Sequence, residues 1–83
     1  MNVTVKYFAS IREAIGAASE SVGTSANTLG ALRDQLIAQG GPHAESLARG
    51  KAVRMALNQV MSDESAALLD GAEVAFFPPV TGG

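Results

Sequence analysis

One amphipathic stripe near the middle of the chain limits what this sequence can fold into. Four apolar residues recur at the spacing i, i+3, i+7 and i+8: Leu29, Leu32, Leu36 and Ile37. This spacing places their side chains on one face of a helix. Three residues before the stripe are candidate N-caps: Ser25, Asn27 and Thr28. Glycine and proline at positions 40–42 are expected to stop the helix. A single stripe cannot bury itself, so the rest of the chain must provide a surface that this helix covers.

Segments typical of β-strands flank this helix on both sides. They cover residues 3–8, 18–24, 51–58, 60–61 and 73–77. Alternation predicts these core-facing residues: Val3, Val5, Tyr7, Val53, Met55, Leu57, Val74 and Phe76. Leu68 and Leu69 are predicted core anchors before the Asp70-Gly71 turn. The fold class predicted is α+β, a sheet with one main helix packed across it.

The segments between these elements are short. Ser10 and Glu13 form a capping-box pattern, with Ser10 as the N-cap of a short helix that Gly16 closes in the left-handed conformation. Residues 43–50 are expected to form a connection with a brief turn, which makes His43 a surface loop residue. Asn58-Gln59 suits a tight turn.

Composition excludes several classes of function. The 83-residue chain is expected to form one domain, and it has no cysteine and one histidine. A metal site or a cysteine nucleophile is therefore not expected. The formal charge of −2 argues against nucleic acid as a partner. No segment has the length of a membrane span or the pattern of a signal peptide, so a cytoplasmic protein is the expectation. No catalytic motif is present, so the chain is not expected to be catalytic alone.

The C-terminal residues contain the one chemically distinctive group. Pro78 and Pro79 cannot donate to a sheet ladder, so we expect residues 1–78 to form the domain and residues 79–83 a stiff, extended tail. The tail residues are Pro79, Val80, Thr81, Gly82 and Gly83. Diglycine without side chains allows the terminal carboxylate to enter a narrow channel. The tail is thus either a presented reactive end or an ordinary frayed terminus.

Two phenylalanines are expected to lie on the face of the sheet opposite the helix. Alternation turns Phe8 and Phe77 away from the core. If the first and last strands are neighbours, both rings share this face, and a partner protein would cover them. The alternative is that one ring lies under a loop.

The whole chain resembles the ubiquitin-like sulfur-carrier family, in particular small subunits of molybdopterin synthase. Three segments carry the resemblance: the start YFASIRE at 7–13, Asn58-Gln59, and the ending EVAFFPPVTGG at 73–83. The resemblance implies a β-grasp fold with a mixed sheet. It implies that an ATP-dependent activating enzyme adenylates Gly83 and that a sulfur donor protein converts it to a thiocarboxylate.

The family resemblance also implies what happens to the sulfur. The tail enters the large synthase subunit, which supplies the catalytic side chains, and donates sulfur to cyclic pyranopterin monophosphate in molybdenum cofactor biosynthesis. Phe8 and Phe77 match partner-facing aromatics, and the complex would be a heterotetramer of small and large subunits. No cofactor is expected on this chain, since ATP belongs to the activating enzyme. Three alternatives stay open: a thiamine-pathway sulfur carrier, a ubiquitin-like protein modifier, and an interaction domain with an inert tail.

Overall fold

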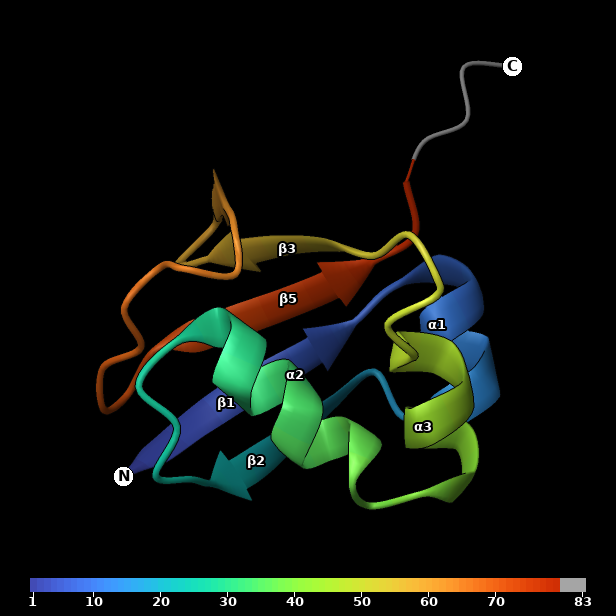
Figure 1. Ribbon diagram of the computed structural model, residues 1–83, viewed down its shortest axis with the longest axis horizontal. Helices are drawn as coiled ribbons and strands as arrows, with labels where there is room; N and C mark the ends of the chain where they lie inside the picture. Colours follow the sequence, from blue (N-terminus) through green and yellow to red (C-terminus); the bar gives the residue numbers. More distant parts are fainter. Residues whose placement is uncertain (80–83) are drawn as a thin grey trace.

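The computed structural model describes residues 1–79, in which helices cover one face of a five-stranded sheet (Figure 1). The strands are β1 (Asn2–Tyr7), β2 (Ser19–Gly23), β3 (Arg54–Leu57), β4 (Val60–Ser62) and β5 (Glu73–Phe77). Their order across the sheet is β2-β1-β5-β3-β4. The central pair β1 and β5 is parallel and every other pair is antiparallel, so the sheet is mixed. The predicted α+β fold class is confirmed.

Helix α2 (Leu29–Ile37) lies across the sheet and forms the centre of the core (Figure 1). Of the N-cap candidates, Thr28 takes the role, and its Oγ1 accepts a hydrogen bond from the Ala31 N–H at 3.1 Å. Leu29, Leu32 and Leu36 are fully buried, as the stripe predicted. These pack against buried strand residues that alternation also identified: Val3, Val5, Tyr7, Met55, Val74 and Phe76.

Helix α1 (Ala9–Ile15) begins earlier than the capping box suggested. The N-cap is Phe8, without any side-chain hydrogen bond, so the assignment of Ser10 was wrong. The reason is Ala9, whose φ of 51° turns the chain directly after β1 and lets the Phe8 carbonyl accept from two helix N–H groups. The predicted C-cap is confirmed, since Gly16 has φ 85° and its N–H donates to the Arg12 carbonyl at 2.8 Å.

The expected connection at residues 43–50 is instead largely helix α3 (Gly41–Leu47). Gly40 and Gly41 have positive φ, and Pro42 stands in the first helical turn, where its missing N–H costs nothing. The glycine-proline signal therefore ends α2 and also starts a new helix. Leu47 anchors α3 because its side chain is fully buried.

Two further predictions about single residues were wrong. Leu68 is buried, but Leu69 is 71% exposed, because the Asp70-Gly71 turn directs it outward while Leu68 is held by the Asn27 carbonyl. His43 is not a surface loop residue: it belongs to α3, only 15% of its side chain is exposed, and it contacts Tyr7 of β1 and Glu20 of β2.

The structure also bears on the classes excluded from sequence. Among residues 1–79, no helix has the length and hydropathy needed to cross a membrane. The same residues contain no group of three or more histidine and carboxylate side chains placed to hold a metal ion.

Candidate functional site

Strand β5 leads from the core to the tail and determines which side chains face outward. Val74 and Phe76 are fully buried under α2, whereas Ala75 and Phe77 point to the opposite face. The strand ends at Phe77, immediately before the two prolines, as predicted. Pro78 and Pro79 are half-buried. The other tail residues, Val80, Thr81, Gly82 and Gly83, lie outside the described residues, so the division into domain and tail stays a prediction.

Phe8 and Phe77 form an aromatic pair at the base of the tail. The parallel pairing of β1 with β5 sets Tyr7 beside Phe76, and the Phe8 N–H donates to the Phe76 carbonyl at 3.1 Å. The rings of Phe8 and Phe77 then meet edge to face, with centroids 6.2 Å apart and planes at 84°. Phe8 is 45% exposed and Phe77 is half-buried. This contact confirms that the two rings lie together on the outer face, as predicted.

The aromatic pair belongs to a larger apolar surface on the same face of the sheet. In the strand register, Ala75 of β5 lies opposite Ala56 of β3, which lies opposite Met61 of β4. The two alanines are almost completely buried, whereas Met61 at the edge is 55% exposed. The same registers place Lys6 beside Ala75 and Arg54 beside Phe77, so charged side chains border the apolar residues. We call this surface the outer-face patch: Phe8, Ala56, Met61, Ala75 and Phe77. In the sequence, only the alternation of apolar residues within single strands indicates this surface. The sequence does not reveal which residues of neighbouring strands lie side by side.

A second cluster joins the core to α3 through one carboxylate. The Tyr7 hydroxyl donates to Glu20 Oε2 at 2.6 Å, and His43 Nε2 lies 2.7 Å from the same oxygen. Since a carboxylate only accepts, the His43 Nε2 carries the proton of that bond. Burial and the hydrogen bond to Glu20 raise the pKa of Tyr7 above its ordinary range. Burial alone would raise the pKa of Glu20, but the bonds from His43 and Tyr7 outweigh it and lower that pKa. The cluster fixes α3 against the antiparallel pair of β1 and β2.

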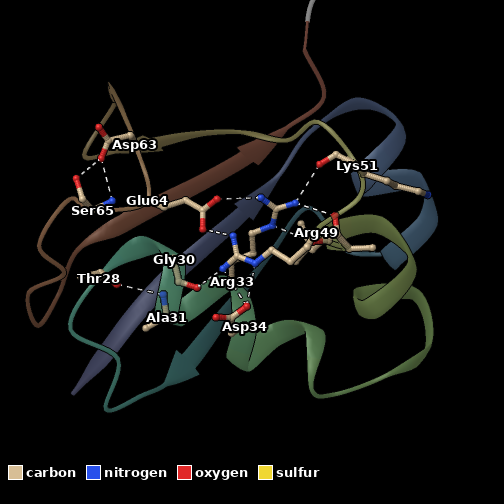
Figure 2. Close-up of polar contacts among 12 residues, drawn as sticks. Thr28, Gly30, Ala31, Arg33, Asp34, Arg49, Lys51, Asp63, Glu64 and Ser65 are labelled. Atoms are coloured by element: carbon tan, nitrogen blue, oxygen red, sulfur yellow. Dashed lines mark hydrogen bonds and ion pairs between the residues drawn. The ribbon is translucent and has the colours of Figure 1, made fainter.

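A third cluster fixes the segment between α3 and β3 (Figure 2). Arg33 of α2 is only 4% exposed. Its guanidinium donates to the carbonyls of Leu47 at 2.8 Å, Ala48 at 2.8 Å and Lys51 at 3.1 Å. Arg49 bridges Asp34 and Glu64 on the exposed side and donates to the Gly30 carbonyl at 3.0 Å. These contacts hold residues 47–51 in one conformation on the surface of α2.

This chain is similar to known proteins both in sequence and in structure. The model of the ThiS family matches residues 5–83. The molybdopterin synthase sulfur carrier subunit of Escherichia coli is 42% identical over 81 residues, covering 98% of this chain and 99% of the relative.

Solved structures share the fold over their full length. SAMP1 from Haloferax volcanii superposes with a TM-score of 0.78 at 25% identity, with complete coverage of both chains. A chain from the complex of subunits 1 and 2 of the molybdopterin-converting factor of Helicobacter pylori superposes with a TM-score of 0.69 at 30% identity, again over both whole chains. The expected β-grasp, ubiquitin-like fold is thus confirmed. With its family model matched over nearly the whole chain and a full-length relative above 40% identity, this protein belongs to the ThiS family.

Proposed function

We propose that this chain is the sulfur carrier subunit of molybdopterin synthase, acting in molybdenum cofactor biosynthesis. One observation carries the proposal: the outer-face patch ends at Phe77, and the next residues of the same strand path are Pro78, Pro79 and the diglycine tail. A protein that binds this patch is therefore placed at the root of the tail. The name of the E. coli relative and the two-subunit complex from H. pylori support this assignment.

The chemistry takes place at the terminal carboxylate of Gly83. In the activating enzyme, a carboxylate oxygen attacks the α-phosphorus of ATP and pyrophosphate leaves, which forms an acyl-adenylate. A sulfur nucleophile at the oxidation level of sulfide then attacks the acyl carbon, the bond to AMP breaks, and a thiocarboxylate remains. This sulfur is delivered to cyclic pyranopterin monophosphate for the dithiolene of molybdopterin. A carboxylate needs this activation because it is a poor acyl donor on its own.

In this proposal the chain contributes the surface that binds the large subunit and the tail that extends into it. The large subunit contributes the catalytic side chains. The outer-face patch supplies apolar area with two aromatic rings, a composition enriched in protein interfaces. From Pro79 to Gly83, an extended tail spans roughly 15 Å at about 3.3 Å per residue. Val80, Thr81 and Gly82 would occupy the channel behind the reacting carbon, where only a slender chain fits. The assembly proposed is a heterotetramer of small and large subunits.

The test is molybdopterin formation in a reconstituted system with the cognate large subunit, the activating enzyme, ATP and a sulfur donor. The full chain should support formation, and a chain lacking Gly83 should not, while both give the same thermal unfolding profile. Molybdopterin formation by the shortened chain would contradict the proposal. Recovery of the full chain only as isopeptide conjugates on lysines would instead indicate a protein modifier.

A further inference from the structure

A pocket of about 160 Å³ opens where the tail leaves the domain, on the side away from the outer-face patch. Its apolar lining combines two residues of α1, Ile11 and Ala14, with Ala52, Val53 and Pro78. Cavities of this size accept a group as large as benzene. The pocket therefore has room for one apolar side chain of a partner.

The polar part of the pocket carries positive charge. Lys51 and Ser46 belong to the lining, and no carboxylate does. Within residues 1–79, the Lys51 ammonium makes no ion pair, and its side chain extends away from the Arg33 cluster (Figure 2). An apolar side chain that enters beside a carboxylate would match both parts of the pocket.

The wall that carries Lys51 is held rigid before any partner arrives. Arg33 donates to the carbonyls of Leu47, Ala48 and Lys51, which spans the whole segment from the end of α3 to the pocket. Burying an arginine costs free energy unless its N–H groups have hydrogen-bond acceptors. Here the three carbonyls are those acceptors, and the same hydrogen bonds hold the segment in place. Because this segment is already ordered, binding a partner here does not cost the conformational entropy of ordering a loop.

The outer-face patch alone is too small for a stable interface. It has five residues, of which Ala56 and Ala75 are almost completely buried, whereas a standard interface uses roughly 20–30 residues a side. An interface centred on Phe77 must extend past the end of β5. Pro78 follows Phe77 directly and lines the pocket, so the two surfaces are continuous around the tail.

We infer that this pocket is a second docking point for the large subunit, which inserts an apolar side chain there and pairs a carboxylate with Lys51. The inference rests on the proposed function, since it assumes that the large subunit surrounds the tail. The large subunit would then contact this chain on both sides of the tail base, at the outer-face patch and at the pocket. These two contacts would fix the direction in which the tail enters the large subunit.

Two variants test the pocket by affinity for the cognate large subunit, measured by titration calorimetry at low and high salt. Ala14→Leu fills the pocket from an exposed helix position and should weaken binding about tenfold. The matched control Ala31→Leu, at an exposed position of α2, should stay within about twofold. Lys51→Glu should also weaken binding about tenfold at low salt, with a smaller effect at high salt, and Lys51→Arg should bind normally.

The outcomes separate this inference from the proposed function. If the unmodified chain does not bind the large subunit, the proposed function itself fails. If the unmodified chain binds and both Ala14→Leu and Lys51→Glu bind equally well, the pocket inference is wrong while the proposed function stands. Loss of adenylation by the activating enzyme with unchanged large-subunit affinity would also overturn it, because the pocket would then serve the other partner. Thermal unfolding of each variant shows that the chain is folded in the assay.

Discussion

Phe8 and Phe77 meet edge to face with ring centroids 6.2 Å apart, although they come from opposite ends of the chain. The contact exists because β1 and β5 are parallel neighbours, so both strands end at the same edge of the sheet. Phe77, the last residue of β5, is thereby held against Phe8, the N-cap of α1. The tail base has a fixed position, which a carrier that must deliver one terminal atom requires.

Phe8 tests the docking role of the outer-face patch. Phe8→Ala should weaken binding to the large subunit about 10- to 100-fold, as expected for an aromatic at the centre of an interface. The free energy of unfolding should change by less than about 1 kcal/mol, because the ring is already half exposed in the free chain. Leu69→Ala removes an apolar side chain that is more exposed than Phe8, at 71% against 45%, from the loop before β5 and should leave binding unchanged. Equal effects of the two substitutions would show that the patch has no special role.

Arg33 tests how the pocket wall is held. Arg33→Met keeps most of the buried apolar stem but leaves three carbonyls without their donor. We expect a loss of about 2–4 kcal/mol in the free energy of unfolding, measured with urea. Arg12→Met, at an exposed position of α1, should cost less than about 0.5 kcal/mol. A cost for Arg33→Met no larger than that of the control would contradict the described network.

Glu20 gives the chain a defined sensitivity to acid. The pKa of Glu20 in the folded chain is below its ordinary value of 4.5. The folded state is therefore stabilised while Glu20 is ionised, and this stabilisation is present above pH 4.5 and lost as the pH falls through the lowered pKa. Glu20→Gln should lose less stability than the unmodified chain when urea unfolding is compared at neutral and acidic pH. Glu45→Gln, on the exposed side of α3, should follow the unmodified chain. An acid dependence of Glu20→Gln identical to the unmodified chain would refute this assignment.

Ala9 tests the strained turn that positions Phe8. Its φ of 51° is unfavourable for a residue with a Cβ by roughly 1–2 kcal/mol. Ala9→Gly should therefore raise the free energy of unfolding by up to about 1 kcal/mol, even though glycine adds freedom to the unfolded chain. Ala14→Gly, in the interior of the same helix, should instead lower it by about 0.5–1 kcal/mol. Destabilisation by both substitutions would mean that Ala9 does not adopt this conformation in solution.

Local periodicity predicted most of the fold correctly. Alternation identified the core faces of β1 and β5, and the stripe beginning at Leu29 identified α2, because each pattern reports burial within one element. Helix α3 was missed because Gly40-Gly41-Pro42 was interpreted only as a helix end, although a proline in the first turn is also typical of a helix start. Leu69 was assigned to the core because adjacent leucines do not reveal which of them the following turn directs outward.

The candidate site was predictable only where it depended on strand alternation. Phe8 and Phe77 were predicted to share a face, and the pairing of β1 with β5 confirms it. His43 was misassigned because its partners Tyr7 and Glu20 lie far away in sequence. The Arg33 cluster gave no local signal either. Gly30 is a poor helix former, but a Cβ there would lie 2.9 Å from Glu64 Oε1 and 3.2 Å from the Glu64 carbonyl oxygen, so the close approach of the 63–65 loop favours glycine.

The central claim is that the terminal carboxylate of Gly83 carries sulfur. Its most direct test is the intact mass of the full chain after incubation with the activating enzyme, ATP and a sulfur source. The account predicts a mass increase equal to the exchange of one oxygen for one sulfur, located by fragmentation at Gly83 and absent when ATP is omitted. An unchanged mass in the presence of an activating enzyme that thiocarboxylates its own carrier would contradict it.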